Sequence, residues 1–123
     1  MMDIDFSNKT VIVTGGTRGI GAAIVVMFQQ CNAQVIATGT NIKHLKRLNQ
    51  ESSGKKTKYI HLDYDSDNSV QEFLGYINKL NRIEILINNA GVNKIDSIHE
   101  IAEKDWDWIN NVNLRGPFML TRT

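Results

Sequence analysis

The sequence has 123 residues, about one domain's length, of which 41% are hydrophobic and 22% charged. These fractions are ordinary for a globular protein and exclude an intrinsically disordered chain. The formal net charge is +1, so no overall field would draw the chain to nucleic acid or to an anionic membrane. No apolar run approaches the ~20 residues that cross a bilayer, and no secretion signal is recognisable at the amino terminus. The single cysteine, Cys31, excludes an internal disulfide and a cysteine-built zinc site. We therefore expect a cytoplasmic globular unit that binds neither nucleic acid nor membranes.

Short apolar segments alternate with longer amphipathic segments along the chain. Runs rich in Val and Ile predict buried strands at residues 10–13, 34–37, 58–62 and 83–87. Apolar stripes at helical spacing predict helices between them, namely Ile20, Ile24, Met27 and Phe28, then Ile42, Leu45 and Leu48, then Val70, Phe73, Leu74, Ile77 and Leu80. Ser66 or Asp67 is expected to cap the third helix. A last helical region begins near Glu103 and runs through Asn113, with a kink or a fresh helix start at Pro117. This alternation predicts an α/β fold, a doubly wound, Rossmann-like parallel sheet of which four strands are present.

A glycine-rich loop joins the first predicted strand to the first helix. It comprises Thr14, Gly15, Gly16, Thr17, Arg18, Gly19, Ile20 and Gly21. Glycines let the backbone turn sharply and approach a diphosphate with no Cβ in the way, and the free N–H groups at the helix start favour negative charge. The spacing departs from G-x-G-x-x-G, so the alternative is a turn that only tightens the packing of helix against strand. The strand–loop–helix context favours a dinucleotide site.

Three further motifs accompany this loop. Asn88, Asn89, Ala90 and Gly91 close the fourth predicted strand, Asp63 follows the third, and residues 106–118 read WDWINNVNLRGPF. Together with Thr14 and its glycine spacing, these motifs resemble the short-chain dehydrogenase/reductase family in its single-domain form, over residues 14–118. The resemblance implies hydride transfer between a nicotinamide cofactor and a small carbonyl or alcohol substrate, in a protein that forms homo-oligomers.

The resemblance also suggests a role for individual positions. Asn113 is the expected catalytic residue. The expected cofactor-binding residues are Gly15, Gly16, Thr17, Arg18, Gly19, Ile20, Gly21, Thr40, Asp63, Tyr64, Asn88, Asn89, Ala90 and Gly91. Independently of the family, Asn88 and Asn89 fall at the carboxyl end of a strand expected to neighbour the first, where ligands bind in doubly wound sheets. The alternatives are that the two asparagines only cap the turn before Gly91 and that Asp63 only ends a strand.

The region after the second predicted strand indicates which nicotinamide cofactor is used. Sites that prefer NAD carry an acidic residue about twenty residues past the glycines, where it bonds the ribose hydroxyls. No Asp or Glu occurs between Asp5 and Glu51. Thr40 and Asn41 could bond a 2′-phosphate, and Arg18 adds a positive charge, although many NADP-binding relatives have Arg or Lys near the position of Thr40. The sequence therefore predicts NADP(H) rather than NAD(H).

One segment imitates a metal site. Asp63, Asp65 and Asp67 have the spacing that opens a calcium loop, but Asn68 and Leu74 stand where that loop requires Gly and Glu. His44, His61 and His99 are far apart in the chain and form no ligand pattern. We predict no metal site.

The resemblance also implies a tyrosine that acts as the general acid/base and a lysine, four residues later, that lowers the pKa of this tyrosine and holds the ribose, and both are missing. Lys does not stand four residues after Tyr59, Tyr64 or Tyr76. We therefore expect residues 1–123 to be the N-terminal part of one NAD(P)-binding domain whose C-terminal half is absent, inactive alone and prone to associate through an exposed fourth strand. The alternative is a non-catalytic nucleotide-binding module or a degraded copy. The sugar-nucleotide epimerases fit less well because their glycine spacing differs.

Overall fold

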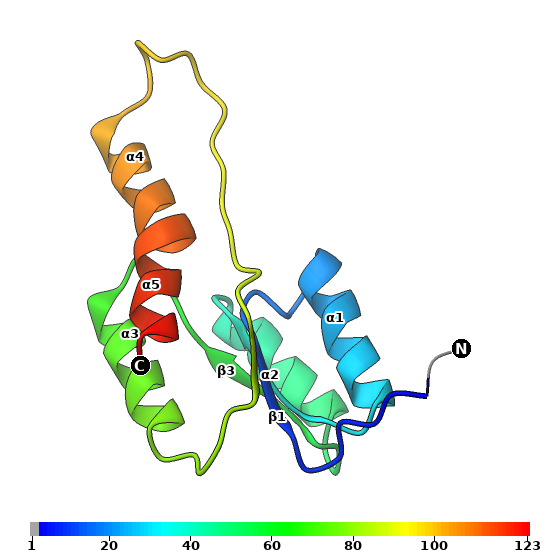
Figure 1. Ribbon diagram of the computed structural model, residues 1–123. Helices are drawn as coiled ribbons and strands as arrows, with labels where there is room; N and C mark the ends of the chain where they lie inside the picture. Colours follow the sequence, from blue (N-terminus) through cyan, green and yellow to red (C-terminus); the bar gives the residue numbers. More distant parts are fainter. Residues whose placement is uncertain (1–2) are drawn as a thin grey trace.

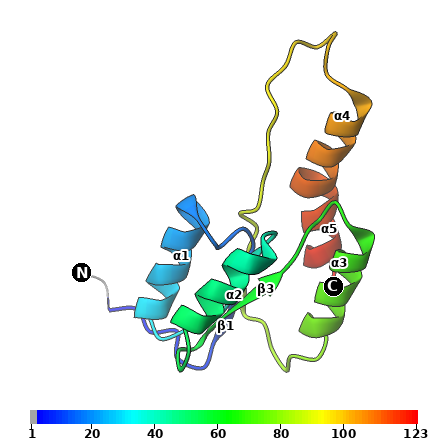
Figure 2. The same ribbon diagram turned by 180° about the vertical axis from the view of Figure 1, so that it is seen from behind.

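The protein is described by a computed structural model that covers residues 3–123. Its elements, in chain order, are β1 (Thr10–Val13), α1 (Gly19–Gln30), β2 (Gln34–Gly39), α2 (Ile42–Glu51), β3 (Thr57–His61), α3 (Asp67–Ile77), β4 (Ile85–Ile87), α4 (Glu103–Asn110), the π-helical segment η1 (Asn111–Arg115) and α5 (Gly116–Thr121). The strands pair in parallel in the order β3-β2-β1-β4. Helices lie on both faces, with α1 and α2 on one side and α3 and α5 on the other (Figure 1 and Figure 2). The predicted α/β fold is confirmed.

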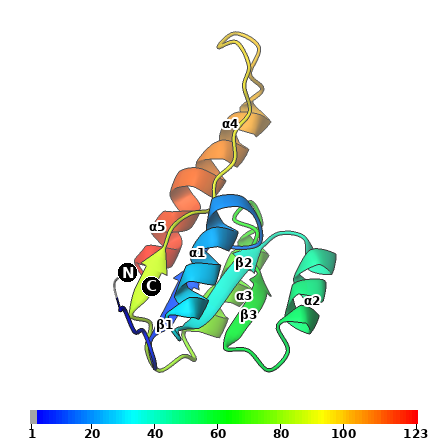
Figure 3. The ribbon, with the colours of Figure 1, turned by 90° about the vertical axis from the view of Figure 1, so that its right-hand side faces the viewer.

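Two hydrophobic layers hold the sheet between the helices. Alternate residues of β1 point to opposite faces, so Val11 and Val13 pack toward α1 while Ile12 packs toward α3. The second layer also contains Val112 of η1 and Leu120 of α5. The column formed by α4, η1 and α5 continues upward past the sheet (Figure 3). The carboxyl ends of the strands therefore lie beside this column.

The strands differ from their predicted ranges at the ends. β2 extends to Gly39 because Thr38 and Gly39 are buried and paired with β3, which begins at Thr57 and ends at His61. β4 begins only at Ile85, so the prediction of strand at residues 83–84 is wrong. Glu84 is the reason, since its side chain accepts a hydrogen bond from the Thr10 amide at 2.7 Å. The side chain thus takes the donor that a longer ladder would use.

The first helix buries half of its predicted stripe. Ile24 and Phe28 pack against the layer that contains Val25, whereas Ile20 and Met27 are 75% and 66% exposed, so the prediction is wrong for these two. Gly21 is also buried and approaches the preceding loop too closely for a Cβ. The cap of the third helix is Ser66, one of the two residues predicted for it. Its side chain accepts a hydrogen bond from the Ser69 amide.

The last helical region is interrupted where the proline approaches. Pro117 has no N–H to donate to the carbonyl four residues earlier, so an α-helical bond is lost at Asn113. The chain adopts the wider π geometry over η1, and the Gly116 amide bonds the carbonyl of Asn111, five residues earlier. α5 then begins at Gly116 with Pro117 in its first turn, but the backbone is helical at Asn111, Arg115 and Gly116. The interruption predicted near Pro117 is therefore a π segment within a continuous helical column, and the alternative of a fresh helix start is wrong.

Candidate functional site: a cavity at the carboxyl ends of the strands

A cavity of about 590 Å³ opens above the carboxyl ends of β1, β2 and β4. β2 and β4 flank β1 on opposite sides, so the cavity lies at the switch point of the doubly wound sheet. Its lining residues are Gly15, Thr17, Arg18, Gly19, Ile20, Gly21, Thr38, Gly39, Thr40, Leu62, Asp63, Tyr64, Asn89, Ala90, Gly91, Val92, Trp108 and Val112. Most of the residues predicted for a cofactor therefore gather around one space.

The glycine loop leaves no room for side chains where it meets the first helix. Gly15 and Gly19 have φ angles of 64° and 57°, which favour glycine. A Cβ on Gly21 would collide with the carbonyl of Gly15 and lie 2.6 Å from the side-chain nitrogen of Asn89. The side chain of the N-cap residue, Arg18, makes no hydrogen bond to the first turn of α1. The N–H groups at the start of that helix are therefore free to face an anion in the cavity.

Thr14 ties the glycine loop to the segment after β4. This side chain is fully buried, and its Oγ1 accepts hydrogen bonds from the amides of Asn89 at 3.1 Å and Ala90 at 3.0 Å. In return, the Asn89 side chain donates to the carbonyls of Thr14 and Gly15, both at 3.1 Å. These bonds cross the sheet between two segments about seventy residues apart in the chain. They fix the glycine loop and the segment after β4, which form two walls of the cavity, relative to each other.

The wall beyond β3 carries one carboxylate. Asp63 is half-buried, its amide donates to the Ser69 hydroxyl at 2.9 Å, and its Oδ1 accepts from the Asp65 amide at 2.9 Å. These two bonds orient the side chain at the strand end. Among the lining residues, all of which lie within 3–123, Asp63 is the only acidic one.

Tyr64 contributes an unusual donor to this wall. It is 4% exposed, and its hydroxyl has no hydrogen-bond partner within residues 3–123. Burial raises the pKa of Tyr64 to about 12, which the nearby Thr14 hydroxyl partly offsets. The group therefore stays protonated at neutral pH, as a buried donor without a partner in residues 3–123.

Asn113 lies on the far side of η1 and grips the backbone after Gly91. Its Oδ1 accepts from the Val92 amide and its Nδ2 donates to the Val92 carbonyl, both at 2.7 Å. Both side-chain polar atoms are thus used on one residue of the cavity wall. Asn113 itself does not line the cavity.

We expect Asn113→Ala to loosen the segment around Val92. Two hydrogen bonds worth about 1 kcal/mol each would be lost, so exchange of the Val92 amide with solvent should accelerate by roughly tenfold or more. Asn110→Ala is the matched control, because Asn110 bonds only the Trp106 carbonyl of its own helix. Nuclear magnetic resonance of the exchanging amides measures both variants. An unchanged exchange rate of the Val92 amide in Asn113→Ala would contradict the view that the Asn113 side chain holds this segment in place.

Two of the residues predicted to bind cofactor lie outside the cavity lining. Gly16 is buried behind the loop, where a Cβ would stand 2.8 Å from the side chain of Ala37. Asn88 points to the other side of β4 and donates to the Thr121 hydroxyl at 3.1 Å. The Asn41 side chain caps α2 by accepting from the His44 amide, so its oxygen is already engaged.

The cavity also contains residues that the motifs did not indicate. These are Thr38, Gly39, Leu62, Val92, Trp108 and Val112. Thr38 and Gly39 could have been found from the strand end they occupy, since ligands bind there. Of the two tryptophans, Trp108 packs against the core while Trp106 is 60% exposed. No signal within the helix distinguishes the two.

In the segment that imitates a calcium loop, two of the three carboxylates are engaged with side chains of η1. Asp65 bonds Asn111 and Asp67 pairs with Arg115. No group of three or more His, Cys, Asp or Glu side chains in residues 3–123 is arranged to hold a metal ion. Within the same residues, no helix has both the length and the apolar character needed to cross a bilayer.

Comparison with known proteins identifies the family. Residues 9–123 match the short chain dehydrogenase family. The chain is 34% identical over 117 residues to the 3-oxoacyl-acyl-carrier-protein reductase of Thermotoga maritima and 33% identical over 125 residues to that of Aquifex aeolicus, covering 93% and 98% of this chain but 48% and 50% of those proteins. The chain thus spans about half the length of the curated relatives it matches.

Solved structures agree with the sequence relatives. A blue fluorescent protein from a metagenomic library, in complex with NADPH, superposes with a TM-score of 0.84 at 29% identity, over 96% of this chain and 50% of its own. A short chain dehydrogenase from Bacillus anthracis superposes with a TM-score of 0.80 at 29% identity, over 93% of this chain and 48% of its own. With the family match over residues 9–123, these likenesses establish that the chain belongs to the short-chain dehydrogenase family of oxidoreductases.

Proposed function

We propose that this chain is the cofactor-binding half of an NADP(H)-dependent oxidoreductase that transfers a hydride between the nicotinamide and a small carbonyl or alcohol substrate. The observation that carries the proposal is the cavity at the switch point, where the glycine loop, Asp63 and the segment after β4 meet. Named relatives reduce a 3-oxoacyl group, which is a carbonyl. We further propose that the complete protein acts in the cytoplasm as a homo-oligomer.

The charge distribution around the cavity supports NADP(H) over NAD(H). β2 ends at Gly39, and Thr40 follows it in the lining with no carboxylate beside it. Arg18 lies at the mouth of the cavity, exposed and without an ion-pair partner in residues 3–123. A 2′-phosphate in this region would meet one cation and the Thr40 hydroxyl and no negative charge, and a neighbouring solved structure holds NADPH.

The remaining cavity residues suit the other parts of such a cofactor. The uncapped start of α1 and the glycines would receive the diphosphate, and the Asp63 carboxylate would accept from the adenine amine. Asn89, Ala90 and Gly91 would border the nicotinamide ribose. When bound, the cofactor supplies the hydride. Asn113 holds Val92 in place at that end of the cavity.

Calorimetric titration of the chain tests the cofactor assignment. We expect NADPH to bind more tightly than NADH. Arg18→Ala should weaken NADPH binding by about tenfold and leave NADH nearly unchanged, because a charge-assisted bond to a phosphate contributes roughly 1.5 kcal/mol. Lys46→Ala is the control, since Lys46 is an exposed cation outside the cavity lining. Tighter binding of NADH than of NADPH would overturn the preference.

The catalytic part of the proposal is tested on the protein encoded by the complete reading frame. Oxidation of NADPH with a ketone substrate would support an oxidoreductase. Binding of NADPH without turnover of any carbonyl or alcohol, in a protein that also lacks a Tyr-x-x-x-Lys sequence, would favour the non-catalytic nucleotide-binding module instead.

A further inference from the structure

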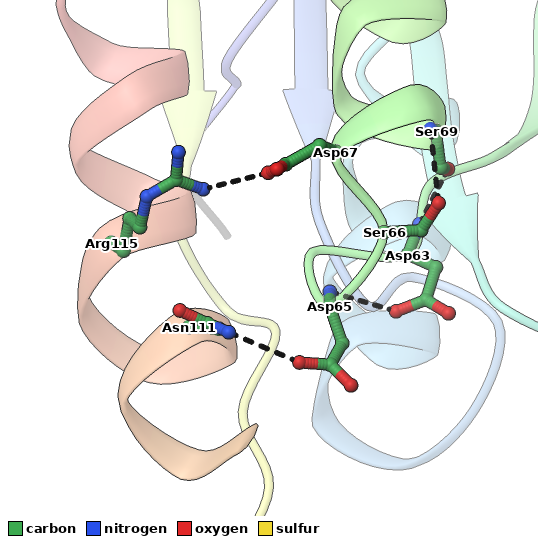
Figure 4. A network of polar contacts seen from close by, with 7 residues as sticks. All are labelled: Asp63, Asp65, Ser66, Asp67, Ser69, Asn111 and Arg115. Carbon is green, nitrogen blue, oxygen red and sulfur yellow. Dashed lines mark hydrogen bonds and ion pairs between the residues drawn. The ribbon is translucent and has the colours of Figure 1, made fainter. Parts of the chain in front are cut away.

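Two polar contacts connect the loop after β3 to the π-helical segment. The Asn111 side chain donates to Asp65 Oδ1 at 3.1 Å, and Arg115 Nη1 lies 3.1 Å from Asp67 Oδ1 (Figure 4). The pairs join positions 46 and 48 residues apart in the sequence. The ring of Tyr64, which precedes Asp65, packs so closely on the column that a Cβ on Gly116 would collide with it. Three neighbouring residues of the loop are thus docked on one side of the column.

The contact at Asp65 continues to the carboxylate of the cavity. The Asp65 amide donates to Asp63 Oδ1 at 2.9 Å, so the same residue that Asn111 holds by its side chain orients Asp63 by its backbone (Figure 4). Within residues 3–123 no hydrogen bond reaches Asp63 Oδ2, which remains available to a donor in the cavity. A chain of two hydrogen bonds therefore runs from η1 to the only acidic group in the lining.

The opposite side of η1 holds the other end of the cavity. Asn111 and Arg115 are four residues apart and lie on one face, whereas Asn113 is two residues from each and grips Val92 on the other. η1 is thus in contact with both ends of the cavity at once.

We propose that Asn111 is a positioning residue for adenine recognition, acting through Asp65 on the carboxylate of Asp63, with the Arg115–Asp67 pair as a second and weaker tie. The proposal rests on the assignment of this cavity to a dinucleotide. Asn111 is partly buried, whereas Asp67 and Arg115 are exposed, with 84% and 48% of their side-chain surface accessible to solvent. Solvent screens exposed ion pairs strongly. The Asn111 contact is itself made to the exposed Asp65, but Asp65 is the residue whose amide bonds Asp63, so we assign the positioning to this contact.

The contact between Asn111 and Asp65 can be tested by exchanging the hydrogen-bond donor and acceptor between the two side chains. Asn111→Asp places a carboxylate against that of Asp65 and breaks the contact. Asp65→Asn alone keeps a carbonyl that accepts from Asn111. The double variant, Asn111→Asp with Asp65→Asn, restores one hydrogen bond with the polarity reversed. Asn110→Asp adds the same charge at the preceding residue, whose side chain bonds only its own helix.

Two readouts on the 123-residue chain decide the proposal. The first is the ratio of affinities for ADP and inosine diphosphate, which lacks the adenine amine. We expect Asn111→Asp to reduce the preference for ADP by about threefold to tenfold, and the double variant and Asn110→Asp to stay within about twofold of the unmodified chain. An equal loss of affinity for both nucleotides would show general loosening and would overturn the proposal.

The second readout needs no nucleotide. Exchange of the Asp65 amide should accelerate in Asn111→Asp and return toward its original rate in the double variant. If the unmodified chain binds neither nucleotide, the proposed function fails, while this exchange still reports whether Asn111 orders the loop. Exchange at Asp65 that is indifferent to both variants would overturn the positioning role, whatever the chain binds.

Discussion

Gly21→Ala should abolish measurable NADPH binding and lower the free energy of unfolding by about 2–3 kcal/mol. Helix propensity alone predicts the opposite sign, because Ala stabilises a helix by about 1 kcal/mol relative to Gly. The steric term is larger here. A Cβ at this position would overlap the carbonyl of Gly15 and lie 2.6 Å from Asn89 Nδ2, and backbone atoms cannot move aside as a flexible side chain does. The displacement would reach the cavity through both neighbours.

Gly75→Ala is the matched control for this substitution. Gly75 lies inside α3, its φ is not positive, and a Cβ there would meet no atom within 4 Å. We expect it to stabilise the chain by about 0.5–1 kcal/mol with unchanged NADPH affinity. Urea unfolding and calorimetry measure both variants. A Gly21→Ala protein as stable as Gly75→Ala would show that α1 can shift freely, contrary to the close contact at the loop.

Thr14→Val is the second substitution with a large expected effect, a loss of about 2–4 kcal/mol in the free energy of unfolding. The change keeps the shape of the side chain and removes the oxygen that accepts from the amides of Asn89 and Ala90. Thr14 is fully buried, so the Ala90 amide would be left without an acceptor at about 1–3 kcal/mol. The Asn89 amide would lose one of its two acceptors, worth about 1 kcal/mol, and keep the Ile87 carbonyl at 3.1 Å. The segment after β4 would also lose its tie to the glycine loop, so NADPH affinity should fall together with stability.

Thr14→Ser separates the hydroxyl from the methyl group. Serine keeps the acceptor and loses one buried methyl, which costs about 1 kcal/mol. Urea unfolding, with the slope checked for constancy, provides the comparison. Equal destabilisation by Val and Ser would mean that packing of the methyl group matters and that the two amide contacts contribute little.

Local motifs predicted the site better than periodicity predicted the packing. The glycine loop and the residues around Asn89 meet in space because parallel strands present their carboxyl ends at one edge, which follows from the order of strands and helices. By contrast, the stripe of α1 placed Ile20 and Met27 inward, and both are exposed. Periodicity gives the spacing of a face but not its exact rotation, since Ile24 and Phe28 of the same stripe do pack against the core.

The sequence by itself determined the α/β class, the parallel sheet, the strand–loop–helix glycine turn and the family, because each is predicted from short local motifs and from their order along the chain. Tertiary structure alone decided which residues complete the cavity, the inclusion of Trp108 rather than Trp106, and the docking of Asp65 on Asn111. These features join segments tens of residues apart. Their geometry depends on close approaches between distant segments, such as Gly21 to Asn89 and Gly116 to Tyr64, which no single segment encodes.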